Sequence, residues 1–259
     1  MNLLPHRRPH ASIEVSEEEG VRYLHFGSRW VQGAMRIARP WSLELEYTRD
    51  MMMALLLRPA KGWPKTMLLI GLGAASLTKF LYRNLPRSIL TVVEIDAAVV
   101  RTATQFFKLP VDPRRIALEI GDGHDFVATT DREFDLILVD GFDAKSRSGK
   151  LNTLEFYRNC RARLTGQGVL AANFLNARRG LAQSLERMSE GFGGRAFALP
   201  HCASGNVIAL AASGVPIALS LDEMRASARR VKRETGLNLL PTLTRLEQTQ
   251  VVGSDQFTL

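Results

Sequence analysis

Apolar runs alternate with amphipathic stretches along the chain from Thr66 onward. Five runs are apolar almost throughout, which is typical of strands buried on both faces of a parallel sheet. In chain order these predicted strands are "TMLLIGLG", "SILTVVEID", "IALEIGDG", "FDLILVDGFD" and "GVLAANFLN". Helices are predicted between them and after the last, over "ASLTKFLYRNL", "AAVVRTATQFF", "DFVATT", "TLEFYRNCRARL" and "GLAQSLERMSEGF". The pattern therefore predicts an α/β domain with helices on both faces of the sheet.

Two further predicted strands, "RAFALPH" and "NVIALAAS", follow the last of these helices. Only the short segment "CASG" separates them, so they can pair as an antiparallel hairpin but not as parallel neighbours. The result is a seven-stranded sheet that ends in an antiparallel pair. This plan resembles that of the S-adenosylmethionine-dependent methyltransferases, so the expected fold class is α/β and Rossmann-like of that type.

The first part of the chain has a different pattern, in which apolar and polar residues alternate over short stretches. "SIEVSEEEGVRYLHFG" and "SRWVQGAMRI" break at glycines and predict a small β-meander. The segment from Ser42 to Pro59 is then predicted to be a helix, with Ser42 as its N-cap. We therefore expect a small N-terminal β-domain over residues 1–50 and a Rossmann-like catalytic domain over residues 51–259.

The chain carries a formal net charge of +8, which raises the question of a nucleic-acid partner. Its lysines and arginines are spread along the sequence, and the densest group, Arg225 to Gly236, is predicted to be the solvated face of a helix that begins near Leu221. We therefore expect no nucleic-acid partner. No apolar run approaches the roughly 20 residues that span a bilayer, and residues 1–15 lack the apolar core of a secretory signal. We expect a cytoplasmic protein without a membrane partner.

Cysteine and histidine positions give no metal-binding pattern. The two cysteines, Cys160 and Cys202, do not have the spacing of a zinc site, and the five histidines are scattered. We expect both thiols to be buried and reduced, and we expect no metal cofactor.

Chemically informative residues follow four of the predicted parallel strands, at the edge where ligands bind in open α/β sheets. Gly71 and Gly73 follow the first strand, where glycines allow a sharp turn and let a ligand approach the backbone. Glu94 follows the second strand and can accept the hydroxyl protons of a ribose. The glycine signal has a purely structural alternative, because a GxG segment can simply form a tight turn.

The third and fourth strand ends complete the predicted pocket. Asp122 beside Gly123 can accept from the exocyclic amine of adenine, although an aspartate after a strand is often only a helix cap. Asp140 and Asp143 follow the fourth strand, where a loop cap or an Asx-turn is the alternative. Because the four signals occur in order at successive strand ends, they predict a nucleoside pocket with a reaction edge.

A dinucleotide would be the usual competitor for such a glycine turn. However, Ser76 stands where the last glycine of a GxGxxG motif belongs. Pyrophosphate would also lie beside several carboxylates, which instead suit a positively charged cofactor. We therefore favour a sulfonium nucleoside.

The segment "FDLILVDGFDAKSRSGKLNTLEFYRNCRARLTGQGVLAANF" resembles the spermidine synthase (polyamine aminopropyltransferase) family, which has a VDxxD turn and an NFY-type helix start here. The resemblance extends to "IGLGAASLTKFLYR", "VVEID" and "GDG", and more weakly to "VQGAM" and "LEYTRDM". These motifs most resemble those of the short bacterial spermidine-synthase-like group. The resemblance implies a small β-domain on a Rossmann-like domain, and a homodimer.

The resemblance also implies a reaction and assigns the cofactor side of the site. The family transfers an aminopropyl group from decarboxylated S-adenosylmethionine to a polyamine amine and releases methylthioadenosine. By this likeness Glu94 would hold the ribose, Asp122 and Gly123 would hold adenine, and Gln32 would line the cofactor site.

On the amine side, the resemblance makes Asp140 and Asp143 the catalytic residues. Asp140 would take a proton from the attacking amine or orient it, and Asp143 would help to bind the amine chain. Tyr47 would line the substrate site. The chemistry of Asp140 is reasonable, because an ammonium has no lone pair and a nearby carboxylate can accept its proton as the nitrogen attacks.

The chain departs from the family pattern on the amine side. Ala74 stands where the family has an aspartate that contacts the amine of the aminopropyl group, and Thr48 and Arg49 replace the His and Glu of a YHE element. The loop "AKSRSGK" after Asp143 is basic where a polyamine would enter. The net positive charge also disfavours long-range attraction of a polycation.

Three functions therefore remain open from the sequence. The first is an aminopropyltransferase, and the second is a methyltransferase that uses intact S-adenosylmethionine, since Ala74 no longer excludes the carboxylate of that cofactor. The third is a non-catalytic, nucleoside-binding relative, because a fold does not fix a function.

Overall fold

A seven-stranded mixed sheet forms the centre of the structure, a computed structural model that describes residues 12–27, 30–58, 60–142, 149–175, 180–249 and 256–259. Its strand order is β6-β5-β4-β7-β8-β10-β9. The bounds are β4 (Thr66–Ile70), β5 (Ile89–Glu94), β6 (Ile116–Ile120), β7 (Phe134–Val139), β8 (Leu164–Leu175), β9 (Ala196–Ala198) and β10 (Asn206–Ala212). Strands β6, β5, β4, β7 and β8 are parallel, whereas β10 is antiparallel to both β8 and β9. The predicted α/β sheet with its final antiparallel pair is confirmed.

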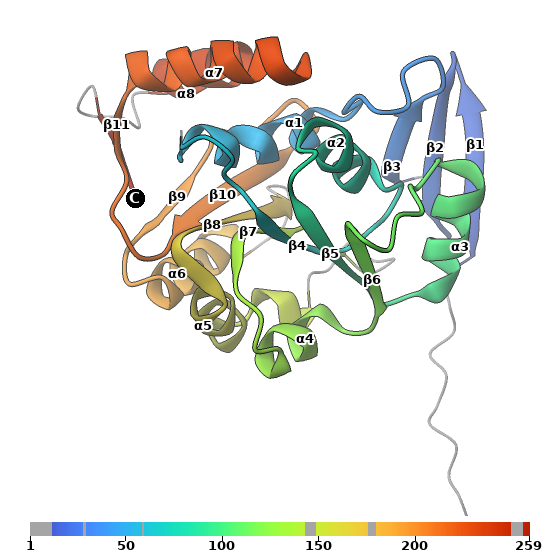
Figure 1. The fold of residues 1–259 in the computed structure, drawn as a ribbon, viewed down its shortest axis with the longest axis horizontal. Helices are drawn as coiled ribbons and strands as arrows, with labels where there is room; N and C mark the ends of the chain where they lie inside the picture. Colours follow the sequence, from blue (N-terminus) through green and yellow to red (C-terminus); the bar gives the residue numbers. More distant parts are fainter. Residues whose placement is uncertain (1–11, 28–29, 59, 143–148, 176–179, 250–255) are drawn as a thin grey trace, which may run out of the picture.

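Helices cover both faces of this sheet, as the buried strands require (Figure 1). One face carries α4 (Gly123–Thr129), α5 (Leu154–Ala162) and α6 (Leu181–Gly191), and the short 3₁₀ turn η2 (Gly149–Asn152) precedes α5. The opposite face carries α2 (Ser76–Asn84) and α3 (Ala97–Phe106). Two apolar cores result, one on each side of the sheet, because successive side chains of the central strands alternate between them.

The predicted N-terminal β-meander is also confirmed. Strands β1 (Ile13–Glu18), β2 (Val21–Phe26) and β3 (Val31–Arg36) form an antiparallel sheet in chain order. It lies beside α2 and α3 at one end of the molecule (Figure 1). The predicted boundary between residues 50 and 51 falls inside the next helix, and the division into two domains stays a prediction.

The single helix predicted from Ser42 to Pro59 is wrong in its bounds. Helix α1 covers only Glu46–Met51 and continues as the 3₁₀ helix η1 (Met52–Leu56), and the N-cap is Leu45 without a side-chain cap. The preceding backbone explains the late start, because the Arg49 guanidinium donates to the Leu43 carbonyl at 3.1 Å and also to the Glu44 carbonyl. These bonds hold the chain before α1 in an extended path.

The C-terminal tail contains more elements than the sequence analysis predicted. Helix α7 (Leu221–Thr235) begins with a capping box between Ser220 and Glu223, as its acidic first turn suggested. It ends at Gly236, and a second helix, α8 (Leu240–Gln248), was not predicted. Nor was the small sheet formed by β11 (Ala218–Ser220) and β12 (Gln256–Thr258).

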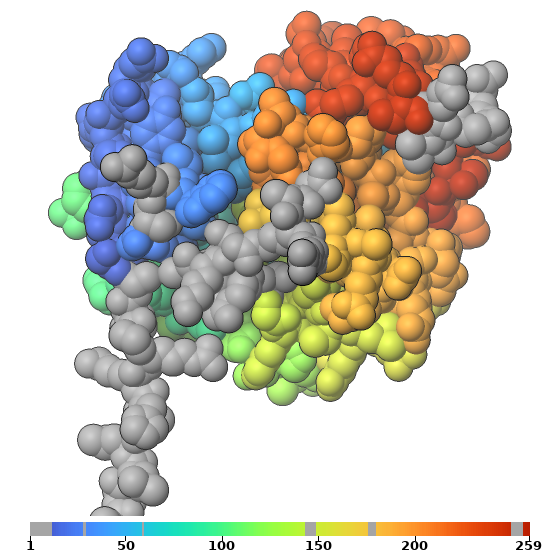
Figure 2. Space-filling model, turned by 180° about the vertical axis from the view of Figure 1, so that it is seen from behind, coloured from blue at the N-terminus to red at the C-terminus, as the bar shows by residue number. Residues whose placement is uncertain are grey.

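The C-terminal helices lie across the molecule from the N-terminal sheet, as the space-filling view of Figure 2 shows. Helix α7 buries Met224, Ala228 and Val231 and leaves its basic residues on the outer face, as predicted. Both cysteines are free and buried, which confirms that expectation. Within the described part of the chain, no helix has the length and apolarity needed to cross a membrane.

Candidate active site

The glycine turn after β4 brings two strand ends into direct contact. Gly71 has a φ of +96°, and a Cβ atom at this position would lie 2.3 Å from the carbonyl oxygen of Asp140. The Asp140 amide donates in turn to the Ile70 carbonyl at 2.9 Å. Because only glycine tolerates both the left-handed φ and this approach, position 71 lets the ends of β4 and β7 meet.

The N-terminal sheet packs directly on the same turn. A Cβ atom on Gly73 would lie 3.4 Å from the carbonyl oxygen of Gln32, in β3. At the start of α2, the Ser76 hydroxyl donates to the Ala34 carbonyl of β3 at 3.1 Å. The backbone of Gln32 therefore lies beside Gly73, while a contact of its side chain with a cofactor stays a prediction.

Glu94, the last residue of β5, stabilises the glycine turn from the other side. Its Oε2 accepts the Leu72 amide at 2.9 Å, and its Oε1 accepts the Asp96 amide at 3.0 Å. Burial raises the pKa of Glu94, and these backbone hydrogen bonds oppose that rise. These backbone amides, together with that of Ile95, do not use all the lone pairs of the carboxylate, which could still accept from a ribose hydroxyl.

Asp122 follows β6 and caps the helix after it. Its Oδ1 accepts the His124 amide at 2.9 Å, and its Oδ2 lies 3.7 Å from the Lys150 Nζ. Gly123 packs on β4, where a Cβ atom would lie 2.3 Å from the Cγ2 of Ile70. The helix cap considered as an alternative is thus present, and the role of Asp122 and Gly123 in binding adenine stays a prediction.

Asp140 lies at the end of β7 and accepts two hydrogen bonds from neutral side chains. The Tyr47 hydroxyl, from α1, donates to its Oδ2 at 3.1 Å, and the Asn173 amide, from β8, donates to its Oδ1 at 2.8 Å. Burial raises the pKa of Asp140, and both donors oppose the rise. Burial, and then the negative charge of Asp140, hold the pKa of Tyr47 well above its ordinary value, so the phenol remains a donor.

The predicted site residues at the strand ends form one continuous row along an edge of the sheet. Asp122, the Gly71 turn and Asp140 follow β6, β4 and β7, and Glu94 ends β5, which lies between β6 and β4. Adjacent ends are linked by backbone hydrogen bonds, since Gly121 donates to Glu94 at 3.0 Å and Gly71 donates to Val93 at 2.9 Å. The carboxylates therefore lie at one edge, as a shared ligand would require.

Known proteins with similar sequences place this chain in a family. Residues 46–189 match the spermine/spermidine synthase domain. Over 237 residues the chain is 33% identical to the polyamine aminopropyltransferase of Chromobacterium violaceum, an alignment that covers 92% of this chain and 90% of the relative. This chain belongs to the spermine/spermidine synthase family.

Solved structures agree with the fold of a spermine/spermidine synthase family member. A probable spermidine synthase from Corynebacterium glutamicum has a TM-score of 0.71 at 21% identity, over 86% of this chain and 85% of that one. Human methyltransferase-like protein 13, solved in complex with SAH, has a TM-score of 0.62 at 24% identity, over 79% of this chain and 92% of that one. The fold is thus one that synthases and methyltransferases share, as the sheet pattern indicated.

The departures of this family member from the spermidine synthase pattern have local structural reasons. The Ala74 methyl is buried under β3, where a Cβ on Gly33 would lie 2.6 Å from it. Thr48 donates to the Leu45 carbonyl at 2.6 Å, and Arg49 holds the backbone before α1. These residues stabilise the packing of the N-terminal segment, and none of them adds a carboxylate to the site.

Part of the predicted amine side lies outside the described residues. Asp143 and two of the basic residues after it, Lys145 and Arg147, are among these. Lys150, the last lysine of that basic loop, is described, and its Nζ lies 3.7 Å from Asp122 and 3.6 Å from Asp125.

Two asparagines near Asp140 were not predicted as site residues. Asn173 donates to Asp140, Asn206 donates to Asn173, and both are buried in largely apolar runs, at 6% and 8% exposure. An asparagine within such a run is a signal, because buried amides need partners. Ile95, directly after Glu94, was not predicted either, and its apolar side chain is 67% exposed.

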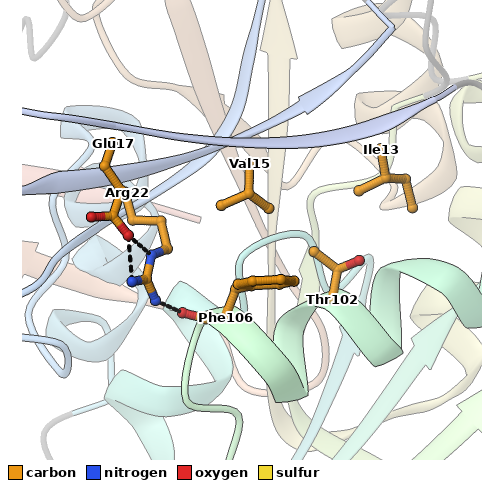
Figure 3. Close-up of a pocket in the computed structure, with 6 residues that line it drawn as sticks. All are labelled: Ile13, Val15, Glu17, Arg22, Thr102 and Phe106. Carbon is orange, nitrogen blue, oxygen red and sulfur yellow. Dashed lines mark hydrogen bonds and ion pairs between the residues drawn. The ribbon is translucent and has the colours of Figure 1, made fainter.

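A separate hollow of about 550 Å³ lies between β1 and α3 (Figure 3). It is lined by Ile13, Val15, Glu17, Arg22, Thr102 and Phe106, and Arg22 joins Glu17 to the Phe106 carbonyl. None of the predicted site residues lines it, so it is distinct from the row of strand ends. In the described part of the chain, no group of three or more His, Cys, Asp or Glu could hold a metal ion.

Proposed function

We propose that this protein transfers the aminopropyl group of decarboxylated S-adenosylmethionine to an amine of a polyamine. The observation that carries this proposal is the environment of Asp140. A carboxylate that is held by two neutral donors, beside a glycine turn, is suited to accept a proton from a cationic amine. Membership of the spermine/spermidine synthase family supports the same reaction.

The proposed reaction proceeds by direct displacement. An acceptor ammonium gives one proton to Asp140, which frees the nitrogen lone pair. The nitrogen attacks the propyl carbon bonded to the sulfonium, and the electrons of the breaking carbon–sulfur bond return to sulfur. Methylthioadenosine leaves as a neutral thioether, and the positive charge of the sulfonium passes to the nitrogen, which becomes a secondary ammonium.

On the donor side, we assign the ribose to Glu94 and the adenine amine to Asp122, with Gly71, Gly73, Gly123 and Gln32 lining the cofactor. The negative charges of these carboxylates favour a cationic sulfonium over an anionic cofactor. Tyr47 and Asp143 would contact the acceptor. These roles rest on position along one sheet edge and on the family resemblance.

We further propose that the protein acts as a cytoplasmic homodimer on small molecules, without nucleic-acid or membrane partners. Family members with this reaction act on diffusible amines, and the Lys and Arg residues of this chain are dispersed along it. Analytical ultracentrifugation of the purified protein tests the dimer directly, and a monomer at micromolar concentration would contradict it.

The reaction is tested by mass spectrometry with each donor in turn. Decarboxylated and intact S-adenosylmethionine are each incubated with the enzyme and putrescine, spermidine or small acidic acceptors. The proposal predicts methylthioadenosine and an aminopropylated amine from the decarboxylated donor only. Methylated product together with S-adenosylhomocysteine would instead identify a methyltransferase, and no turnover with either donor would identify a binding protein.

A further inference from the structure

Two buried asparagines extend the hydrogen bonds of Asp140 into the sheet. Asn173 lies within β8, and Asn206 is the first residue of β10. In the antiparallel register Asn173 is opposite Ile208 and Asn206 is opposite Leu175, so the two asparagines are diagonal neighbours on one face. The link therefore connects Asp140, after β7, to β8 and β10, the next two strands of the sheet.

The hydrogen bonds in this row all run in the same direction. Ser204 Oγ donates to Asn206 Oδ1 at 2.7 Å, Asn206 Nδ2 donates to Asn173 Oδ1 at 2.9 Å, and Asn173 Nδ2 donates to Asp140 at 2.8 Å. Every donor points toward the carboxylate. A buried row with one direction strengthens its last hydrogen bond, because each member polarises the next.

The orientation of the Asn173 amide depends on Asn206. A half-turn of that amide would aim its carbonyl oxygen at Asp140 and its NH₂ group at the NH₂ group of Asn206. Both contacts would be repulsive, since each pairs like partial charges in a buried place. With the Asn206 donor removed, the second repulsion disappears and the Asn173 carbonyl loses its partner.

The other groups around Asp140 leave the carboxylate dependent on neutral donors. Tyr47 approaches from α1, and Cys202 Sγ lies 3.0 Å from Ser204 in the turn before β10. The same turn is tied to α1, because the Ala203 amide donates to Glu46 at 2.9 Å. Among the described residues, no lysine or arginine forms an ion pair with Asp140.

We propose that Asn206 is a positioning residue for the transfer reaction, which it serves by fixing Asn173 in the orientation that donates to Asp140. This inference rests on the proposed aminopropyl transfer. Asn206 has no contact with Asp140 itself, so it acts on the base only through Asn173. The Asn173 donor that it orients favours the ionised form of Asp140, which is the form that can accept the proton of the acceptor amine.

The test is the pH profile of kcat/KM in Asn206→Leu, which keeps the approximate shape of the side chain and removes the donor. A hydrogen bond to a charged group is worth enough to move a pKa by about one unit. We therefore expect the acidic limb of the profile to move about one unit to higher pH, and kcat on that limb to fall about tenfold. The KM for the donor should stay within about twofold.

The matched control is Ser184→Ala, which removes a buried hydrogen-bonding side chain on α6, away from Asp140. It should lower stability without moving the acidic limb. An unmoved limb in folded Asn206→Leu would overturn the proposal. If the leucine variant fails to fold, Asn206→Ala takes its place under the same criterion.

A second measurement separates this inference from the reaction on which it rests. In wild-type protein labelled with ¹⁵N-asparagine, the side-chain NH₂ signal of Asn173 should shift with pH as Asp140 titrates. That shift should move to higher pH in Asn206→Leu whether or not the protein transfers aminopropyl groups. A titrating signal without turnover would reject only the reaction, whereas a signal unaffected by the substitution would reject the role of Asn206.

Discussion

Glu94 combines a structural role with a predicted binding role in a single carboxylate. It accepts one backbone amide from the glycine turn and one from the start of the following segment. The same side chain thus shapes the turn that would carry the donor and presents the oxygens that would hold its ribose. Its two roles cannot be removed independently, because the same two oxygens that accept the backbone amides would also accept the ribose hydroxyls.

Glu94→Gln is expected to weaken binding of methylthioadenosine at least about tenfold and to lower the free energy of unfolding by about 1–3 kcal/mol. The new NH₂ group would face a backbone amide, which is also a donor. Calorimetric titration and urea unfolding measure the two effects. The control is Glu119→Gln on edge strand β6, where the side chain is partly exposed and pairs with Arg132. Equal effects of the two substitutions on binding and on unfolding would contradict the role of Glu94.

Helix α1, which carries Tyr47, is held in place by the C-terminal helix α8. Arg245 of α8 pairs with Glu46 at 2.8 Å and with Asp50, and Thr242 donates to Asp50 at 2.6 Å. Asp50 is only 2% exposed, and burial raises its pKa while Thr242 and Arg245 lower it. An element that the sequence analysis did not predict therefore supports one of the predicted site residues.

Arg245→Met should lower the free energy of unfolding at pH 7 by about 3 kcal/mol, because it leaves the Asp50 carboxylate buried without its charge partner. The loss should shrink as the pH falls, since protonated Asp50 no longer needs the guanidinium. Urea unfolding at pH 7 and pH 5 measures both effects. Arg158→Met, which removes an exposed pair with Glu190 far from α8, should lower the free energy of unfolding much less, because water already solvates both partners. A loss in Arg245→Met that is no larger than this would contradict the role of α8.

At the scale of the whole molecule, the N-terminal sheet and the Rossmann-like sheet meet around the end of α3. Arg22 of β2 donates to the Phe106 carbonyl, and Lys79 of α2 donates to the Phe107 carbonyl at 2.8 Å. Lys79 is 1% exposed, and burial, with a smaller effect of Lys108, lowers its pKa from 10.5 to about 7. The junction therefore contains a lysine whose charged form is disfavoured by folding.

This buried lysine makes stability depend on pH in a defined direction. Between pH 7 and 10.5 the unfolded chain binds a proton at Lys79 that the folded protein does not, so the stability contributed by this residue rises with pH. Relative to Lys79→Met, wild-type protein should gain about 2 kcal/mol of unfolding free energy from pH 7.5 to 9.5. Urea unfolding measures this gain, and the exposed Lys61→Met serves as the control. A constant difference between wild type and Lys79→Met would contradict a neutral buried lysine.

Much of this architecture could be predicted from the sequence, because it follows from local pattern. Apolar runs specified the parallel strands, and glycines and carboxylates directly after them specified the edge that holds Gly71, Glu94 and Asp140. The start of α1 could not be predicted, since Arg49 reshapes the backbone before it through side-chain bonds. The link between Asn173 and Asn206 joins residues 33 positions apart through the register of β8 and β10, which no local pattern contains.

The central claim is that Asp140 accepts the proton of the amine that attacks the donor. The most direct test is the single-turnover rate of Asp140→Asn with saturating decarboxylated S-adenosylmethionine and putrescine. Asparagine keeps the shape but cannot accept the proton, so the rate should fall at least about 100-fold. Affinity for methylthioadenosine should stay within about threefold. A rate close to that of the wild-type enzyme would contradict the claim and remove Asp140 from the mechanism.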